Sequence, residues 1–225
     1  MISLRDLKGL EECRAAYDMQ HAVWGDDDLA DPPDLMMVVQ SEGGLVAGAF
    51  ENDRLIGYVF GFPTKDPAVQ HSHRLAVLPE FQGRGLGAAL KEYQRNWCAA
   101  RGIRIIRWTY DPLMLRNANL NINALGAVGT GYLVNYYGSA GSYQGGIDSD
   151  RLIAERHVAG RPRVTVEAQV AVAPDFPRLM REDPPAAEAA RLAARDALLA
   201  QFAQGLAVTG FDMATATYSL GRVLD

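Results

Sequence analysis

Two histidines one residue apart, His71 and His73, open the segment "HSHRLAVLPEFQGRGLG". The segment is typical of a strand, on which alternate side chains share a face, so both imidazoles are expected beside Leu75 and Val77. A pair of imidazoles can act as a general base, for example toward an alkyl ammonium, which with a pKa of about 10 is mostly protonated at neutral pH. A histidine, whose ordinary pKa is about 6.5, can accept that proton directly or through a water.

Two other interpretations of the histidine pair compete with catalysis. His-x-His on a strand is also a metal-ligand spacing, but the spacing of His21, His157 and the aspartates indicates no further ligand. Histidines can also be structural, hydrogen-bonded inside a sheet. The glycine-rich loop that follows makes both less favoured, and no metal site is predicted.

That loop joins the histidine strand to a helix. Glycines let the backbone approach a ligand closely, and the first amides of a helix are unpaired donors, so the loop suits a pyrophosphate, with Arg84 as an added cation. The spacing is neither the dinucleotide fingerprint nor a nucleotide P-loop. A turn that merely needs flexible residues is the alternative. The loop consists of Gln82, Gly83, Arg84, Gly85, Leu86 and Gly87.

The elements that must position these residues alternate between helices and strands. Apolar periodicity predicts helices over 7–25, 85–101 and 113–127, and strands over 44–52, 54–63, 70–79 and 103–110. Two more strands are expected in "GYLVNYYG" and "DRLIAERHV". The order indicates one α/β or α+β domain over 1–157. Residues 158–225 are expected to form a strand-helix-strand extension packed on it.

Composition narrows the possible functions of the chain. The 225 residues carry a net charge of -5, so the basic footprint of a nucleic-acid-binding protein is missing. No apolar run reaches the roughly 20 residues that span a membrane, and the N-terminus does not read as a signal peptide. The two cysteines have no metal or redox spacing, which favours a cytoplasmic protein with reduced thiols.

"LAVLPEFQGRGLGAALKEYQRNWCAARG" resembles motif A of the GNAT acyltransferases: an apolar strand, Pro-Glu, Gln-x-x-Gly-x-Gly and a helix. The order of elements over residues 1–157 also resembles that superfamily. The resemblance implies the GNAT fold, a central mixed, mostly antiparallel sheet flanked by helices. It also implies acetyl-CoA or another acyl-CoA as co-substrate, with its pyrophosphate on the loop amides and its pantetheine arm on the backbone of Leu75, Ala76 and Val77.

"HSHRLAV" is similar to the His-x-His-x-Leu-Ala-Val stretch of arylalkylamine N-acetyltransferases, where the paired histidines assist amine deprotonation. The similarity implies that His71 and His73 accept the proton. It also implies that the backbone amide of Leu75 donates to the thioester carbonyl and stabilises the developing oxyanion.

The resemblance extends to "WTYDPLMLRNANLNINALGA", where GNAT enzymes commonly carry an Asn that contacts CoA and a Tyr that protonates the leaving thiolate. Asn117 and Asn119 are candidates for the first role. Ile122 stands where the Tyr is usual, so Tyr132 and Tyr136, expected on the next strand, are candidates for the second. The block is similar to a bacterial GNAT subgroup with "WT-x-DP" and "NYYG", some of whose members resemble N-acyltransferases of amino acids.

The predicted activity is transfer of an acetyl or succinyl group from acyl-CoA to a primary amine of a small molecule, such as an amino acid, by direct attack in a ternary complex. Neither cysteine has a neighbouring base that would favour a covalent route. A non-catalytic acyl-CoA-binding module is the main alternative, and a metal-dependent enzyme using the histidines is another. A homodimer is a common expectation for such enzymes.

Overall fold

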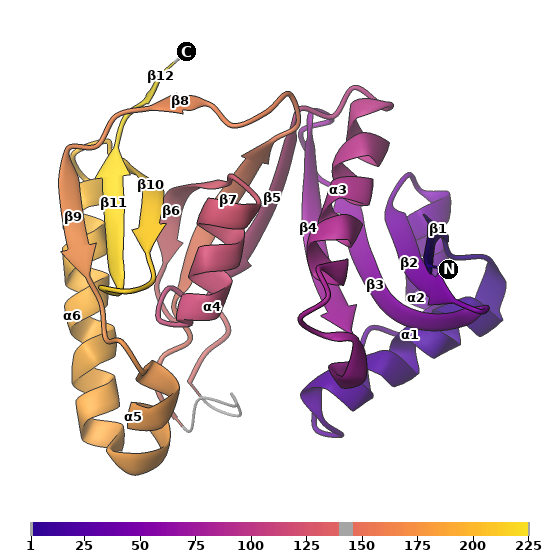
Figure 1. The fold of residues 1–225 in the computed structure, drawn as a ribbon, viewed down its shortest axis with the longest axis horizontal. Coiled ribbons are helices and arrows are strands. Elements are labelled where there is room, and N and C mark those ends of the chain that lie inside the picture. Colours follow the sequence, from indigo (N-terminus) through magenta and orange to yellow (C-terminus); the bar gives the residue numbers. More distant parts are fainter. Residues whose placement is uncertain (1, 140–145, 225) are drawn as a thin grey trace. The chain divides into compact units, whose positions relative to one another are not determined.

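The computed structural model describes residues 2–139 and 146–224 of the chain, which fall into two compact units, residues 1–106 and 107–225 (Figure 1). The boundary between the units lies inside a strand rather than at residue 157. The expected division into a core over 1–157 and an extension over 158–225 stays a prediction.

The first unit is built on four antiparallel strands in the order β1-β2-β3-β4. They are β1 (Ile2–Asp6), β2 (Leu45–Glu51), β3 (Arg54–Pro63) and β4 (Val69–Val77). Asn52 and Asp53 both have positive φ, 49° and 65°, which suits the two-residue hairpin turn expected between β2 and β3. Strand β1 is an addition that the sequence pattern did not predict, since the segment is only five residues long.

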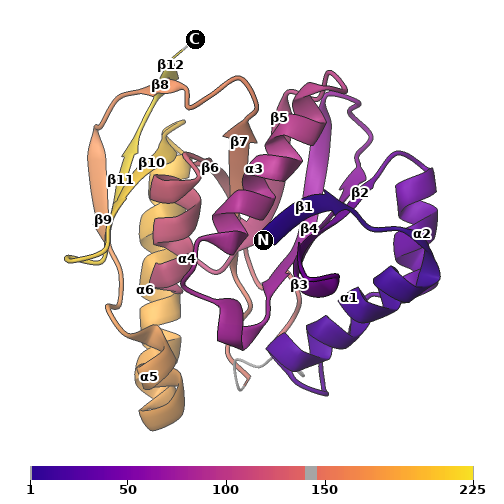
Figure 2. The same cartoon turned by 45° about the vertical axis from the view of Figure 1, so that its right-hand side comes forward.

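Helices cover both faces of these strands. On one face lie α1 (Gly9–Trp24) and α2 (Pro33–Ser41); on the other lies α3 (Leu86–Ala99), after a short 3₁₀ turn, η1 (Pro79–Phe81). Figure 2 gives a second view of this arrangement. Helix α1 ends at Gly25, whose φ of 94° is one that glycine adopts easily, so its predicted end is confirmed.

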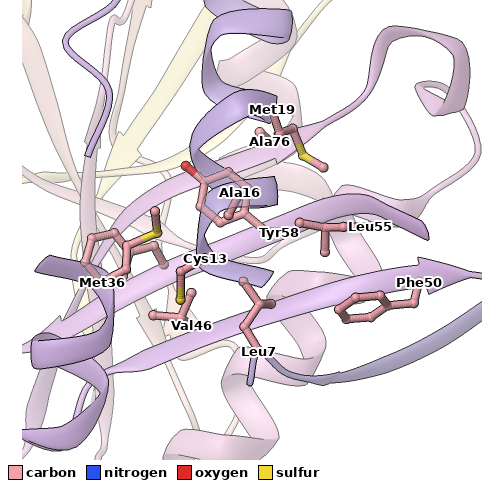
Figure 3. Close-up of a cluster of buried hydrophobic side chains, with 11 residues drawn as sticks. Leu7, Cys13, Ala16, Met19, Met36, Val46, Phe50, Leu55, Tyr58 and Ala76 are labelled. Atoms are coloured by element: carbon pink, nitrogen blue, oxygen red, sulfur yellow. The ribbon is translucent and has the colours of Figure 1, made fainter. Parts of the chain in front are cut away.

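Two apolar clusters fix the helices to the sheet. Figure 3 shows the cluster under α1, where Cys13 and Ala16 face the side chains of β2 and β3, including Val46 and Tyr58. The cluster under α3 joins Leu86 and Leu90 to the opposite face of the same strands. Each face of the sheet is therefore buried, which explains why β2 and β3 read as nearly continuous apolar runs.

The second unit has its strands in the order β5-β7-β6-β10-β11-β9. These are β5 (Ile105–Tyr110), β6 (Val128–Leu133), β7 (Arg151–His157), β9 (Ala168–Ala171), β10 (Ala207–Asp212) and β11 (Thr217–Gly221). The helices are α4 (Leu115–Ala118), a π-helical turn η2 (Asn119–Ala124), α5 (Phe176–Glu182) and α6 (Pro184–Phe202), and β8 (Arg163–Val164) pairs with β12 (Val223–Leu224). Helix α6 lies where a helix is expected beyond residue 157, while α5 and the division of the last strand into β10 and β11 were not expected; the strand-helix-strand extension stays a prediction.

Ion pairs bind α6 to the strands of this unit. Arg191 makes a bidentate contact to Asp111, with N–O distances of 2.8 and 2.6 Å, and both side chains are buried. One turn later, Arg195 bonds Asp150 and Asp148. The C-terminal helix is thereby part of the same core as β5 and β7. No helix among the described residues is long and apolar enough to cross a bilayer.

Candidate active site

Strand β4 contains a β-bulge at the histidine pair. Phe60 of β3 pairs with Arg74, and the next residue, Gly61, pairs with Ser72, so His73 is the extra residue between them. A bulge of this kind turns two consecutive side chains toward the same face. His73 and Arg74 accordingly both contact the segment between α1 and α2.

The bulge decides which predicted site residues share a face. His71 and His73 do share one, with ring centroids 6.1 Å apart, and His71 stacks on Phe62 at 4.9 Å. Leu75 and Val77 instead pack in the apolar cluster under α3, on the opposite face. The prediction that all four side chains share a face is wrong, because it assumed strict alternation through the bulge.

The acidic segment after α1 bonds directly to the bulge. Asp31 Oδ1 lies 3.1 Å from His73 Nε2, and Asp31 Oδ2 lies 2.9 Å from Arg74 Nε. Arg74 also donates to Asp28 Oδ2 at 2.7 Å and to the carbonyl of Leu29. Sequence reasoning missed Asp31, since a contact across 42 residues leaves no spacing signal.

A cavity of about 360 Å³ opens beside His73 on the same face. Its walls come from α2 and β3, with Phe60 and Phe62 on the strand, and His73 and Asp31 also line it. The remaining lining residues are Leu35, Val38, Val39, Glu42 and Pro63. His73 therefore borders a mostly apolar space.

The glycine loop has the geometry of an anion cradle. Gly83 and Gly85 have φ values of 75° and 78°, and a Cβ at either position would meet nothing within 4 Å. Gly85 precedes the first residue of α3, so the helix presents its unpaired first amides at the loop. Gln82 and Arg84 hold the loop by donating to the carbonyls of Val77 and Glu80. These residues fit the pyrophosphate of an acyl-CoA.

A row of buried polar side chains lies on the α3 face of β4. Gln94 donates to Gln70 at 2.7 Å and accepts from Ser72 at 3.0 Å, and Lys91 donates to Ser72 at 2.6 Å. Cys98 belongs to this row, and burial raises the pKa of its thiol to about 12. A thiol that stays protonated is a poor nucleophile.

In the second unit, the Asn-rich segment forms a π-helical turn rather than a regular helix. Asn121 accepts from Trp108 Nε1 at 3.1 Å, and Asn123 bonds both Asn119 and the carbonyl of Phe211. Asn117 is exposed and open to a ligand, while Asn119 already accepts a hydrogen bond. π-Helical turns occur frequently at functional sites.

The two candidate tyrosines differ sharply in environment. Tyr132, on β6, donates its hydroxyl proton to Asp150 at 2.7 Å. Burial, followed by the nearby Asp150 carboxylate, raises the pKa of Tyr132 well above its usual range. Tyr136 lies in the turn after β6, not on the strand as expected, and is 54% exposed. The prediction that Tyr136 lies on the strand is wrong, because β6 begins and ends earlier than the aromatic pattern suggests.

A comparison with known protein families covers the same part of the chain. Residues 10–120 match the model of the acetyltransferase (GNAT) family. The chain carries a GNAT acetyltransferase domain. With this domain, the protein is an acyl-CoA-dependent N-acyltransferase, and acetyl-CoA or another acyl-CoA is its co-substrate. The predicted family and fold class are confirmed.

Solved structures share the fold of this GNAT protein at low sequence identity. The ribosomal-protein-S18-alanine N-acetyltransferase from Escherichia coli is 18% identical, with a TM-score of 0.58 over 70% of this chain and 94% of that one. An N-acetyltransferase from Staphylococcus aureus Mu50 is 16% identical, with a TM-score of 0.57 over 70% and 99%. An aminoglycoside 6'-N-acetyltransferase complexed with coenzyme A is 16% identical, with a TM-score of 0.54 over 72% and 99%. No curated protein matches the sequence.

The geometry also bears on a metal at the histidine pair. Over residues 2–139 and 146–224, no group of three His, Cys, Asp or Glu side chains is arranged to hold a metal ion. His73 has Asp31 beside it, but two such groups are fewer than the three protein ligands of a catalytic zinc.

Proposed function

We propose that this GNAT protein transfers an acetyl or succinyl group from acyl-CoA to a primary amine of a small molecule, with amino acids among the candidates. The observation that carries the proposal is that His73 both lines the cavity beside α2 and β3 and lies 3.1 Å from the Asp31 carboxylate. Direct attack by the amine in a ternary complex is the proposed route, because the thiol of Cys98 is buried and protonated.

The histidine pair would take the proton from the substrate ammonium. A carboxylate can only accept a hydrogen bond, so Asp31 favours the tautomer of His73 in which Nε2 carries the proton and Nδ1 is the base. His71, 6.1 Å from His73 between ring centroids, is close enough to relay the proton through a water.

The strand and loop that follow would hold the acyl-CoA. Backbone groups of Leu75, Ala76 and Val77 are proposed to pair with the pantetheine arm, and the amide of Leu75 to donate to the thioester oxygen. The amides of residues 82–87 are proposed to bind the pyrophosphate. The open space over Gly83 and Gly85, just before α3, supports this pyrophosphate site. In the second unit, Asn117 and Asn119 are proposed to contact the CoA arm, with the exposed Asn117 the more accessible.

The group that protonates the thiolate is proposed to be a tyrosine. Tyr136 is the better candidate of the two, because its ring is half exposed and a ligand can approach its hydroxyl. Tyr132 already donates to Asp150, so its proton is held by a structural partner. A cytoplasmic location and a homodimer, both expected from the sequence, complete the proposal.

The proposal is tested by replacing both histidines with alanine and following free-thiol release from acetyl-CoA and succinyl-CoA against a panel of amines. Loss of turnover by about 100-fold or more, with CoA binding retained in calorimetry, is expected if the pair is the base. Full activity in the double variant would contradict the assigned base. If the unmodified protein binds CoA but turns over none of the amines, it is an acyl-CoA-binding module instead.

A further inference from the structure

Three consecutive backbone amides fix the turn that carries Tyr136. The amide of Asn135 donates to Oδ1 of Asp150 at 2.8 Å. The amides of Tyr136 and Tyr137 donate to the carbonyl and the hydroxyl of Ser149, at 3.1 and 2.8 Å. In return, the Asn135 side chain accepts a bond from the Ser149 amide at 3.1 Å. The turn after β6 is therefore fixed to residues 149 and 150 although it belongs to no strand.

The two rings of this turn also pack on their surroundings. Asn135 has a φ of 46°, in the left-handed region that asparagine adopts more readily than most residues. The rings of Tyr136 and Tyr137 meet edge to face, with their centroids 4.7 Å apart, and the Arg151 guanidinium lies 5.0 Å from the Tyr137 ring. Tyr136 is still 54% exposed. Its ring is restricted on one side and accessible to a ligand on the other.

Helix α6 supplies the cation that holds the segment beneath the turn. Arg195 Nε donates to Asp150 Oδ2 at 2.8 Å, and Nη2 donates to Asp150 Oδ1 at 2.9 Å and to Asp148 Oδ2 at 2.7 Å. The Asp150 side chain is fully buried, so its charge needs a cation and several donors. A planar guanidinium can bond both oxygens of one carboxylate at once.

The bonds from α6 and from the turn meet at one atom. Asp150 Oδ1 accepts both from Arg195 Nη2 and from the Asn135 amide. A shift of this carboxylate would therefore move the Asn135 amide and the tyrosine that follows it. Helix α6 and the turn both lie outside residues 10–120, which match the GNAT model. This connection is thus separate from the part of the chain that the family model covers.

We infer that Arg195 is a positioning residue for the transfer reaction: through Asp150 it holds residues 134–138 and so fixes where the hydroxyl of Tyr136 lies. This inference rests on the proposed function, in which Tyr136 protonates the thiolate. It gives helix α6 a part in turnover as well as in stability. Arg195 acts through the Asp150 carboxylate and the Asn135 amide rather than on the substrate.

Arg195→Lys in the full-length protein tests the inference while a cation stays beside Asp150. Lysine keeps the charge but lacks the planar fork that makes three contacts. We expect kcat to fall at least about tenfold, because small displacements of a reacting group are costly, with KM for acyl-CoA unchanged. Leu198→Ala is the stability control, since Leu198 is a fully buried apolar residue of the same helix. It should lower the melting temperature with normal kcat. Normal kcat in Arg195→Lys, or equal kcat losses in both variants, would overturn the inference.

Two further variants keep the test sharp. Adding Arg195→Lys to Tyr136→Phe should lower kcat no further than Tyr136→Phe alone, because both changes act on the same hydroxyl. A full additional loss would show that Arg195 acts elsewhere and would overturn the inference. If Arg195→Lys does not fold, Asn135→Gly loosens the turn from its other side and leaves the ion pair in place. Normal kcat in that variant would count equally against the inference.

Hydrogen exchange separates this inference from the proposed function, because it needs no turnover. The amides of residues 134–138 should exchange at least about tenfold faster in Arg195→Lys than in the unmodified protein, and at the normal rate in Leu198→Ala. Unchanged exchange in Arg195→Lys would overturn the inference. Faster exchange and lower kcat in Arg195→Lys, with full activity of Tyr136→Phe, would uphold Arg195 as a positioning residue and refute Tyr136 as the acid.

Discussion

Asp31 and His73 are 42 residues apart in the chain, yet Oδ1 of the aspartate lies 3.1 Å from Nε2 of the imidazole. The aspartate comes from the segment between α1 and α2, and the histidine is the extra residue of the bulge in β4. Arg74, the next residue of the strand, holds the other oxygen of the same carboxylate. Asp31 is therefore held in place by the residue next to His73, the proposed base.

Asp31→Asn is expected to lower kcat by about tenfold to 100-fold, because an amide can also donate to the imidazole and stabilise the unproductive tautomer. KM for acyl-CoA should not change, since Asp31 is not in the glycine loop. Asp28→Asn is the matched control: it removes a second carboxylate partner of Arg74 but leaves the contact to His73. Steady-state kinetics of both variants are compared. Equal losses would mean that Asp31 acts only through Arg74.

Gly85→Ala is expected to raise KM for acyl-CoA, because alanine disfavours the φ of 78° that shapes the loop. The strain of about 1–2 kcal/mol per residue should also lower the melting temperature. Gly102→Ala provides the control, since Gly102 has a φ of 73° and follows the other end of α3. It should lose similar stability with normal KM. If Gly85→Ala and Gly102→Ala raise KM for acyl-CoA equally, the change at Gly85 acts through lost stability and not through the loop.

Several parts of the fold follow from local chemistry and were predictable. The turn at Asn52 and Asp53, the end of α1 at Gly25 and the position of α3 each depend on residues close in sequence. The bulge at His73 was not predictable, because it depends on the pairing of β4 with β3 rather than on the composition of β4.

The same distinction explains the candidate site. The histidine pair and the glycine loop are continuous in sequence and carry a recognisable pattern. Asp31 enters only through tertiary packing, and the acidic run around it could equally have been a solvated cluster. Tyr132 was singled out by residue type, but its hydroxyl partner, Asp150, lies on the segment before β7 and could not be known from spacing.

Tyr132→Phe is expected to keep most of kcat and to lose stability, because it removes the hydrogen bond to buried Asp150. The cost should be about 1–3 kcal/mol, as for a buried acceptor that loses one donor. Tyr136→Phe is expected to do the reverse, lowering kcat while leaving stability almost unchanged, since Tyr136 is half exposed. Each variant controls for the other in paired kinetics and denaturation. A large kcat loss in Tyr132→Phe alone would reassign the acid.

Cys98 is expected to resist thiol reagents in the folded protein. Burial raises the pKa of its thiol to about 12, so the thiolate is scarce at pH 8, and the side chain is fully buried against Gln70. Burial also raises the pKa of the Cys13 thiol. Reaction with a chromogenic disulfide should be slow in buffer and reach two thiols per chain in denaturant. Rapid labelling of the native protein would show that α3 opens readily, and Cys98→Ala would identify the reacting thiol.

Asp150 is expected to make the stability of the protein fall in acid. Burial raises the pKa of its carboxyl, but hydrogen bonds from Arg195, the Asn135 amide and Tyr132 outweigh it, so the folded-state pKa is lowered. A lowered pKa adds stability above the unfolded value of about 3.9, and that stability is lost as pH falls through the folded-state pKa. The free energy of unfolding should therefore decrease below about pH 4.

Asp150→Asn removes this titrating group. We expect it to cost about 3 kcal/mol or more at pH 7, because Arg195 loses the buried half of its pairing, and to make the decline below pH 4 shallower. Asp148→Asn is the control, because it also pairs with Arg195 but is 35% exposed, and such pairs contribute about 1 kcal/mol or less. Urea denaturation between pH 3 and 7, followed by circular dichroism, measures both variants. If Asp150→Asn retained the full acid dependence, carboxylates elsewhere in the chain would be responsible for it.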